Sequence, residues 1–448
     1  MPHRVALPAV LLTCTMLLSP HPAAAGLRQY VDRPDDTYTY AIVREQAMAG
    51  GKAHVVRLQS QTWQGKPWRH WLTILVPARL EHPDKAVLMV GGGSNRDEPP
   101  AVDAAASHPF VAAASQLGVP VAVLHQVPNQ PLFDGMHEDD AIAHTFEQYL
   151  KGQAQADDAG RDWPLLLPMV KSAVRAMDTV ERVLAAEHGL SVDGYVVAGA
   201  SKRGWTTWLT AAIDPRVQAI APMVIDVLNF LPQMRQQQAT YGQASPMIRD
   251  YTQRGLLAAL DTRHGQRLTN LVDPFAYRAA LTLPKLILLG TNDPYWTVDA
   301  ANLYLDQLAG PTHLVYEPNA GHGLTANVMP TVMAFVERVL SNRTMPALRF
   351  DRRPTDAGEG EGVTLTVTWD EPATSAVLWQ ATSTDRDFRQ AQWRSRQLEM
   401  ADGHAEVTLE APGAGWVAAF VQVRFAGGRS FALSTPMTVL PEHFPHRR

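Results

Sequence analysis

The chain has 448 residues, 46% of them apolar and 19% charged, a balance typical of globular proteins with a large core, and it is long enough to predict two domains. Its formal charge of -5 is spread along the sequence without basic clusters, which argues against nucleic acid and anionic membranes as partners. The expected substrate is a small molecule or a peptide.

The first 25 residues have the features of an export signal. His3 and Arg4 precede an apolar run from Val5 to Leu18, and the small residues Ala23–Ala25 predict cleavage after Ala25. The apolar run is too short to span a bilayer, so no stable membrane insertion is expected. The mature chain, expected to be soluble, would be periplasmic or secreted.

The only cysteine, Cys14, lies inside this signal, so a chain cut after Ala25 would contain no thiol and no disulfide. Stability would then come from the core. The alternative is a lipoprotein with Leu11-Leu12-Thr13-Cys14 as the lipidation site, which leaves a very short apolar region.

From about Tyr30 to Leu340, short apolar runs alternate with longer helical stretches, a pattern that predicts a mostly parallel sheet covered on both faces. Leu165–His188, which ends at Gly189, and Met329–Leu340 are predicted helices. The eight predicted strands are His54–Thr62, Trp68–Val76, Ala86–Val90, Val119–Leu124, Gly194–Val197, Ile220–Ile225, Leu283–Leu289 and His313–Tyr316. We expect an antiparallel hairpin from the first two and parallel pairing of the last six.

A long helix-prone segment, about residues 226–280, separates two predicted strands where a plain crossover needs far fewer residues. We therefore expect a helical cap over the site. Its Met234, Tyr241, Met247 and Tyr251 either line a substrate pocket or pack the cap onto the rest of the domain.

After Leu340, turn residues and an alternation of period two replace the helical pattern. Residues 26–345 are therefore predicted to form the first domain, and residues 346–448 an accessory β-sandwich of ordinary domain size. Its predicted strands are Val363–Trp369, Ala376–Thr382, His404–Glu410, Trp416–Phe425 and Phe431–Val439.

The strongest local signal is the run from Gly194 to Trp205, in which an apolar strand leads into Ser201 between small residues and then into an apolar helix. This context predicts a nucleophile elbow, a tight turn that holds the serine in strained backbone angles. The usual motif G-x-S-x-G has glycine where this chain has Arg203, with Gly204 one residue later. The other interpretation is an ordinary β-to-α turn with a serine cap.

Two later loops supply the groups that activate a serine. Asp293 follows the strand Leu283–Leu289, and His322 lies between glycines after the strand His313–Tyr316. Serine, acid and histidine thus occur in the order of an α/β-hydrolase. His322 would take the proton of Ser201, while Asp293 would fix the imidazole tautomer and stabilise the imidazolium. Singly, the aspartate could cap a helix and the histidine could be an ordinary loop residue.

An acyl-transfer site also needs N–H donors for the developing oxyanion. The backbone N–H of Lys202, directly after the nucleophile, is one predicted donor. The second is expected from Gly91–Asn95, which follows a strand, and we assign it to Ser94 with Gly93 as the near alternative. The competing interpretation of this segment is a flexible turn.

Neither a metal nor another cofactor is predicted. The acidic run His137–Asp140, followed by His144, lacks the spacing of two zinc-binding histidines on one helix face. Trp205 and Trp208, behind the serine, are expected in the core.

Several longer stretches form a distinctive set: Val127-Pro-Asn-Gln-Pro-Leu132, Trp163-Pro-Leu-Leu-Leu-Pro-Met-Val-Lys-Ser-Ala-Val-Arg-Ala-Met-Asp178, Gly199-Ala-Ser-Lys-Arg-Gly-Trp205, Asp214-Pro-Arg-Val217 and Gly321-His322-Gly323. Together they resemble the PhoPQ-activated pathogenicity-related protein family over nearly the whole mature chain. The resemblance implies an exported or secreted α/β-hydrolase-like protein whose serine motif corresponds to Ser201. It also implies that Lys202-Arg203 within the motif is a family trait, and it leaves the substrate open.

The first functional hypothesis is a serine hydrolase that cleaves an ester or amide through an acyl-enzyme on Ser201. The runner-up is a dipeptidyl-peptidase-like serine peptidase, although no propeller-like repeats or acidic amine-binding motif can be placed. A third is a non-catalytic secreted binding protein whose C-terminal domain docks a protein or the cell surface.

Overall fold

The computed structural model describes residues 22–95, 98–102, 105–154, 161–355 and 362–446. Most of the predicted export signal, with Cys14, lies outside these residues. Helix α1 (Pro22–Asp32) begins before the predicted cleavage point after Ala25 and buries Leu27 and Tyr30. Among the helices that the structure describes, none combines the length and the apolar character needed to cross a bilayer.

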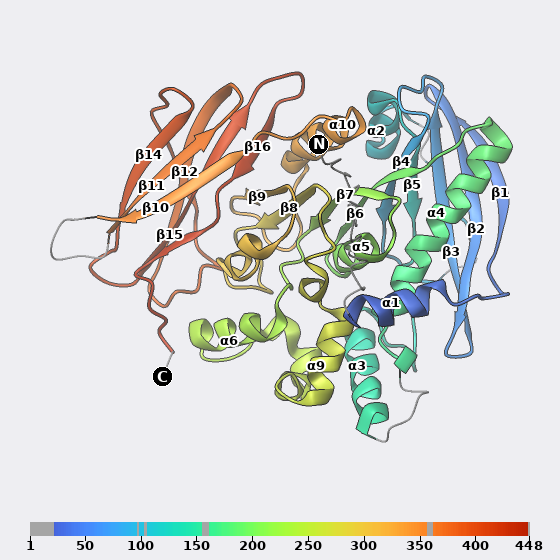
Figure 1. Cartoon of the computed structure of the whole chain (residues 1–448), viewed down its shortest axis with the longest axis horizontal. Helices are drawn as coiled ribbons and strands as arrows, with labels where there is room; N and C mark the ends of the chain where they lie inside the picture. Colours follow the sequence, from blue (N-terminus) through green and yellow to red (C-terminus); the bar gives the residue numbers. More distant parts are fainter. Residues whose placement is uncertain (1–21, 96–97, 103–104, 155–160, 356–361, 447–448) are drawn as a thin grey trace, which may run out of the picture.

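A nine-stranded sheet organises the larger part of the described chain, in the order β1-β2-β3-β5-β4-β6-β7-β8-β9 (Figure 1). β1, β2, β3 and β5 pair antiparallel in succession, and β5, β4, β6, β7, β8 and β9 pair parallel. The strands are β1 (Thr39–Met48), β2 (Gly51–Trp63), β3 (Lys66–Pro77), β4 (Lys85–Val90), β5 (Val121–Leu124), β6 (Gly194–Ala200), β7 (Val217–Met223), β8 (Lys285–Gly290) and β9 (Thr312–Glu317). The predicted fold class is confirmed.

All eight predicted strands of this sheet are present. The expected hairpin is β2–β3, and its turn residues Gln64 and Gly65 both have positive φ, 48° and 70°, as a two-residue turn of type I′ requires. The prediction missed β1, an edge strand whose polar run Arg44–Gln46 lacks the apolar alternation of a half-buried strand.

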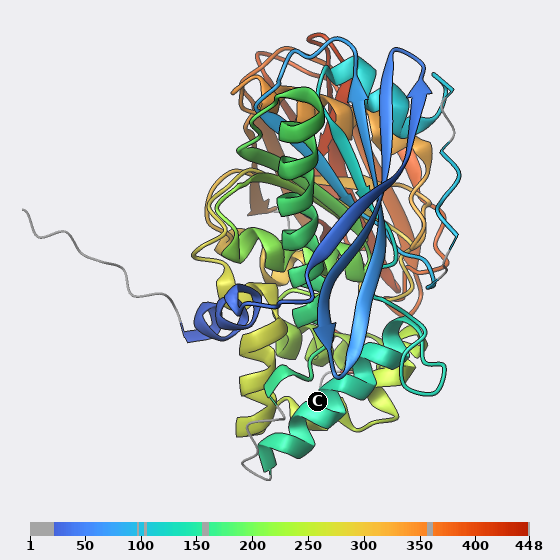
Figure 2. The ribbon, with the colours of Figure 1, turned by 90° about the vertical axis from the view of Figure 1, so that its right-hand side faces the viewer.

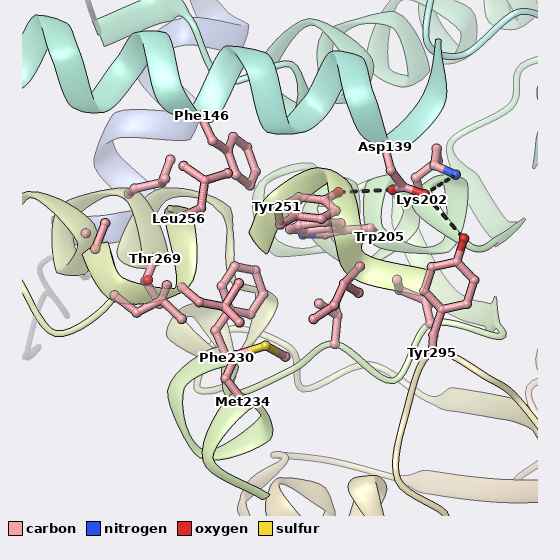
Figure 3. A pocket seen from close by; sticks show the side chains of 18 of the residues that line it. Asp139, Phe146, Lys202, Trp205, Phe230, Met234, Tyr251, Leu256, Thr269 and Tyr295 are labelled. Atoms are coloured by element: carbon pink, nitrogen blue, oxygen red, sulfur yellow. Dashed lines mark hydrogen bonds and ion pairs between the residues drawn. The ribbon is translucent and has the colours of Figure 1, made fainter. Parts of the chain in front are cut away.

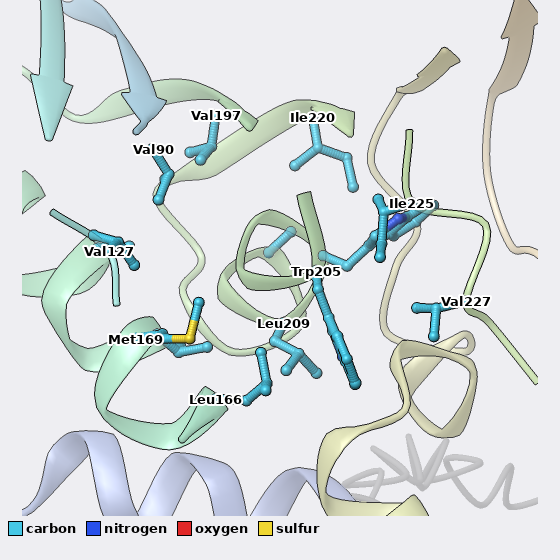
Figure 4. Packing of buried hydrophobic residues seen from close by; sticks show 14 of the residues in the cluster. Val90, Val127, Leu166, Met169, Val197, Trp205, Leu209, Ile220, Ile225 and Val227 are labelled. Carbon is cyan, nitrogen blue, oxygen red and sulfur yellow. The ribbon is translucent and has the colours of Figure 1, made fainter. Parts of the chain in front are cut away.

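Helices cover both faces of the sheet (Figure 2). One face packs against α1, α4 and α5, and the other against α2 and α10. Successive strand residues point to opposite faces, so Tyr195 and Val197 of β6 enter the first core and Val196 enters the second. Figure 4 shows the first core, where Met169 from α4 and Leu209 from α5 meet strand residues. These helices are α2 (Pro109–Leu117), α4 (Leu166–His188), α5 (Lys202–Ile213) and α10 (Met329–Leu340).

The predicted cap is helical and gathers at one end of the sheet (Figure 1). It comprises α6 (Phe230–Tyr241), α7 (Arg249–Thr252), α8 (Leu256–Ala259) and α9 (Arg263–Val272). An additional helix, α3 (Glu138–Ala154), packs against α7, α8 and α9. The site is therefore covered by helices from two separate parts of the chain.

Separate antiparallel sheets follow α10. One has the order β10-β11-β14, and the other β13-β12-β15-β16 with β17 paired to β15. Their strands are β10 (Leu348–Pro354), β11 (Gly362–Trp369), β12 (Ala373–Ser383), β13 (Arg394–Gln397), β14 (His404–Glu410), β15 (Trp416–Phe425), β16 (Phe431–Ser434) and β17 (Thr438–Leu440). The last predicted strand is divided at Pro436, and β10 and β13 were not predicted.

The C-terminal sheets lie beside β9, the last strand of the large sheet (Figure 1). The N–H of Tyr316 in β9 donates to Ser434 Oγ at 3.0 Å, and Gln422 Nε2 donates to the carbonyl of Tyr316 at 3.1 Å. An edge strand otherwise presents unpaired backbone groups, so these side chains cover that edge.

Candidate active site

Ser201 lies in the turn between β6 and α5, with φ 56° and ψ -131°. Such a positive φ is unfavourable for a residue with a Cβ and occurs mostly where the surroundings enforce it. Here the N–H of Ser201 donates to the carbonyl of Met223 in β7 at 2.8 Å, while its own carbonyl accepts from Trp205 at 3.0 Å. The turn thus holds the hydroxyl beyond the carboxyl end of β6.

Two glycines make this turn possible. A Cβ on Gly199 would lie 2.6 Å from the carbonyl oxygen of Arg203, and one on Gly204 would lie 2.6 Å from Ile225 Cγ2. Gly204 therefore provides the close packing between α5 and the segment after β7. The usual motif has glycine at the position of Arg203. The arginine is tolerated there because its side chain points away from the turn, toward Glu138 and the carbonyl of Val127.

The three residues expected from widely separated loops lie together. His322 Nε2 is 2.9 Å from Ser201 Oγ, and His322 Nδ1 is 2.9 Å from Asp293 Oδ2. The other carboxylate oxygen of Asp293 accepts from the N–H of Tyr295 at 3.0 Å. A neutral imidazole protonated on Nδ1 would donate to the aspartate and accept the serine proton.

Burial differs along this chain of hydrogen bonds. The Asp293 side chain is 6% exposed, whereas that of His322 is 27% exposed. The ring of Tyr295 lies against the imidazole, with centroids 4.3 Å apart. The carboxylate of Asp293 is therefore enclosed, whereas the imidazole of His322 lines the pocket beside Ser201.

The predicted oxyanion donors lie in two segments. Lys202 is the first residue of α5, and its ammonium is buried in ion pairs with Glu138 at 2.9 Å and Asp139 at 3.2 Å. In the glycine loop, Gln130 Nε2 donates to the carbonyl of Gly93 at 3.1 Å, and Gln126 Nε2 donates to that of Ser94 at 3.0 Å. Gly93 and Ser94 are not among the described residues that line the pocket at Ser201.

Glu138 links the start of α5 to the glycine loop, a connection that the sequence did not reveal. Its carboxylate accepts two bonds from the Arg203 guanidinium, at 2.9 and 2.6 Å, and one from Gln130 at 2.6 Å. Burial disfavours its charged form, but the bonds and charges of Arg203 and Lys202 outweigh burial and lower its pKa to about 2. A Cβ on Gly92 would lie 2.7 Å from Arg203 Nη2, so the guanidinium packs directly under the glycine loop.

A pocket of about 870 Å³, its mouth included, opens beside Ser201 and His322 and runs under the cap. Of the four cap residues considered above, Met234 and Tyr251 line it. Met247 is 42% exposed, and the hydroxyl of Tyr241 donates to the carbonyl of Trp296 at 3.0 Å.

Figure 3 shows this pocket from close by, with Asp139, Lys202 and Tyr295 at one end and Phe230 and Met234 toward the other. Trp208 is buried in the core as expected, whereas Trp205 also lines the pocket. Helix α3 contributes Asp139 and Phe146, which the sequence did not identify. No group of three or more His, Cys, Asp or Glu side chains among the described residues is arranged to hold a metal ion.

Comparisons with known proteins give both sequence and structural similarities. The family model of the PhoPQ-activated pathogenicity-related proteins matches residues 27–389. Autocrine proliferation repressor protein A of Dictyostelium discoideum is 30% identical over 433 residues, covering 89% of this chain and 85% of that protein. The family match extends from α1 into the C-terminal sheets.

Among solved structures, an acetyl xylan esterase from Paenibacillus sp. R4 is 12% identical with a TM-score of 0.48, covering 70% of this chain and 92% of that one. A glucuronoyl esterase from Solibacter usitatus is 13% identical with a TM-score of 0.42, covering 71% of this chain and 92% of the esterase.

Proposed function

The chain belongs to the PhoPQ-activated pathogenicity-related protein family, and from this membership and the geometry of the site we propose that it is an exported serine hydrolase. It cleaves an ester or amide bond through an acyl-enzyme on Ser201. The observation that carries the proposal is the continuous series of contacts from Ser201 Oγ through His322 to Asp293, 2.9 Å at each step, at the mouth of a pocket.

In the proposed acylation, Ser201 Oγ attacks the substrate carbonyl carbon while His322 Nε2 takes the hydroxyl proton. The charge that develops on the carbonyl oxygen is stabilised by the backbone N–H of Lys202 and a second N–H from the glycine loop, assigned to Ser94 or Gly93. His322 then donates the proton to the leaving oxygen or nitrogen, and the carbonyl carbon remains bonded to Ser201.

Deacylation repeats these steps with water. His322 takes a proton from the water, whose oxygen attacks the acyl carbon, and returns that proton to Ser201 Oγ as the acid departs. Asp293 keeps Nδ1 protonated and stabilises the imidazolium in both halves. This mechanism requires no cofactor.

Export is proposed from the first 25 residues, and the hydrolase domain is proposed to occupy residues 26–345, with 346–448 as the accessory domain. The runner-up, a dipeptidyl-peptidase-like enzyme, needs an acidic group that binds a peptide amine. Near the site, Glu138 and Asp139 are already paired with Arg203 and Lys202, an arrangement that favours the ester hydrolase.

A second candidate function is that of a secreted binding protein. The Dictyostelium relative is named as an autocrine repressor of proliferation. In this candidate the hydrolase fold is a scaffold, and the C-terminal domain binds a protein or a cell surface.

Labelling with a fluorophosphonate separates these functions, because the reagent modifies serines activated by a neighbouring base. The full-length chain should be labelled, and Ser201→Ala should abolish the adduct. Absence of labelling in the folded wild-type protein would favour the binding function. Parallel assays with p-nitrophenyl esters and dipeptide anilides then separate esterase from peptidase.

A further inference from the structure

The pocket beside Ser201 changes character along its length. Near the serine it contains charged and hydroxyl groups, from Asp139, Lys202, Tyr251 and Tyr295 (Figure 3). Beyond Trp205 the walls are almost entirely hydrocarbon and aromatic. The residues of this inner part include Phe146, Phe230, Met234, Leu256, Leu260 and Leu268.

The polar groups at the near end already satisfy one another. The hydroxyls of Tyr251 and Tyr295 both donate to Asp139, at 3.0 and 3.5 Å, and the same carboxylate pairs with the ammonium of Lys202 at 3.2 Å. The tyrosine rings, and not their hydroxyls, therefore face the pocket. A sugar or a peptide backbone would lose hydrogen bonds to water on entering this pocket and would gain no hydrogen bonds to the protein in return. A hydrocarbon chain has no such hydrogen bonds to lose, and its burial is favourable.

Aromatic contacts fix the walls of the inner part. Trp205 meets Phe230 edge to face with centroids 5.4 Å apart, and Phe146 meets Trp205 in the same way at 6.0 Å. The indole nitrogen of Trp205 donates to the carbonyl of Val272 at 2.6 Å, which fixes the ring between α5 and the cap. The space is thus formed before a ligand arrives.

The orientation of a bound ester follows from His322. This histidine must protonate the leaving oxygen, and at 27% exposure it lies at the open side of the site. The carbonyl oxygen must face the N–H of Lys202 at the start of α5, and from there the pocket extends past Trp205 under the cap helices. The chain attached to the carbonyl carbon is therefore directed inward, and the alcohol outward.

We propose that the inner pocket binds the acyl chain of a carboxylic ester, a hydrocarbon chain longer than acetyl, while the alcohol leaves through the open side. This inference rests on the proposed function. In the reaction, the bond between the acyl carbon and the alcohol oxygen breaks and a bond to Ser201 Oγ forms. The serine proton passes through His322 to the departing alcohol.

The test compares two series of esters on the full-length chain. With p-nitrophenol as the constant alcohol, kcat/KM should rise roughly threefold to fourfold per added methylene from acetate to butanoate and hexanoate, because each methylene is buried. With acetate as the constant acid, lengthening an alkyl alcohol should change kcat/KM by less than about twofold per methylene. A preference that appears in the alcohol series, or in neither series, would overturn the proposal.

Variants of Met234 locate the preference in this pocket. Met234→Trp should lower the ratio of hexanoate to acetate kcat/KM by about tenfold or more, and Met234→Ala should shift the preferred chain to greater length. Met247→Trp, on the exposed surface of the same cap, should leave the ratio unchanged. If Met234→Trp fails to fold, Met234→Ala still tests the proposal. An unchanged preferred acyl-chain length in Met234→Ala would contradict it.

Fluorophosphonate labelling distinguishes a failure of the acyl pocket from a failure of the proposed function. If Ser201 is labelled but acyl length has no effect, the acyl pocket is wrong and the proposed function stands. If the folded protein is neither labelled nor able to cleave any ester, the proposed function fails and the acyl pocket fails with it.

Discussion

The side-chain amide of Asn292 donates to the carbonyl oxygen of Ala391 at 2.7 Å. This bond joins the loop of Asp293 to the part of the chain after residue 345, here called the C-terminal module. Asn319, three residues before His322, makes a comparable connection, since its Oδ1 accepts from the N–H of Trp393 at 2.8 Å. The segment that follows β12 thus contacts both loops that supply the proposed acid and base. We infer that the C-terminal module positions these loops.

Replacing Asn292 with alanine should therefore impair turnover more than substrate binding. Loss of the bond to Ala391 frees the loop that carries Asp293, and misplacement of a catalytic group by about 1 Å can cost on the order of a hundredfold in rate. We expect kcat for p-nitrophenyl butanoate to fall about tenfold or more with KM within about twofold. Steady-state kinetics and the rate of fluorophosphonate labelling measure this effect.

Asn302 offers a matched control, because its amide donates to the carbonyl of Met437 at 2.7 Å, also in the C-terminal module. Asn302→Ala should lower the free energy of unfolding by about 1 kcal/mol, the usual contribution of one hydrogen bond. Asn292→Ala should lower it by at least as much, because its amide also lies 3.3 Å from the carbonyl oxygens of Phe388 and Arg389. Only Asn292→Ala should lower kcat. Equal losses of kcat in both variants would show that the effect is one of general stability.

Asp293→Asn tests the proposed acid. An amide can donate to His322 Nδ1 and so favour the wrong tautomer, which leaves Nε2 protonated and unable to accept the serine proton. We expect kcat to fall on the order of 10⁴-fold while the unfolding transition in urea changes little. Asp306→Asn, at an exposed aspartate in the same part of the chain, should retain full activity. A small loss for Asp293→Asn would assign the acid to another residue.

The sequence predicted those features that depend on local patterns. Apolar runs identified the strands, and placement of Ser201, Asp293 and His322 after three strands indicated that their side chains meet, because carboxyl ends of parallel strands share one edge. The bonds from Asn292 and Asn319 to backbone carbonyls of the C-terminal module leave no such pattern, since any residue has a carbonyl. They depend on how two parts of the chain pack.

The site's supporting network was missed for a related reason. Arg203 was recognised only as a departure from the usual serine motif, and Glu138 belongs to an acidic run that lacks the spacing of a zinc site. Their pairing requires the start of α3 to lie beside the start of α5, a contact between segments 65 residues apart in the chain. The hydrophobic periodicity of neither segment predicts that the two helix starts lie side by side.

Arg203→Met should weaken catalysis through the glycine loop. The substitution removes both bonds to Glu138 and the support beneath Gly92, so the predicted oxyanion donor at Ser94 or Gly93 loses its position. Loss of one oxyanion donor typically costs on the order of a hundredfold in kcat or more, and we expect a loss of about tenfold to a hundredfold from its displacement. Ester kinetics measure it.

Arg254→Met is the matched control for this substitution. Arg254 also pairs with two carboxylates of α3, Asp140 at 2.6 Å and Glu147 at 3.0 Å, but it does not pack under the glycine loop. The control should keep its kcat within about twofold. An equal loss in the two variants would mean that α3 as a whole, and not the loop, had been disturbed.

Glu138 should also make stability depend on acidic pH. Its pKa is lowered from 4.5 to about 2 because the bonds and charges of Arg203 and Lys202 outweigh its burial. The stabilisation is complete above pH 4.5 and is lost as pH falls toward 2. Allowing for its partly exposed side chain, we expect the loss to be about 1–2 kcal/mol. The free energy of unfolding, measured in urea at several pH values in this range, should depend less on pH in Glu138→Gln than in the wild-type protein. An equal pH dependence in the two proteins would contradict the assignment.

Asp226, which follows β7, should have the opposite effect. Burial, together with the nearby charges of Asp293 and Asp299, raises its pKa from 3.8 to about 7, although the neighbouring hydroxyl of Tyr304 acts in the other direction. The folded state therefore binds a proton that the unfolded chain releases, so stability falls as pH rises from 3.8 through 7. Asp226→Asn removes this ionisation and should raise the free energy of unfolding by about 1–3 kcal/mol at pH 8, with no gain near pH 4. Urea titrations at the two pH values measure the difference, and a gain of equal size at both would show that the asparagine acts through packing instead of charge.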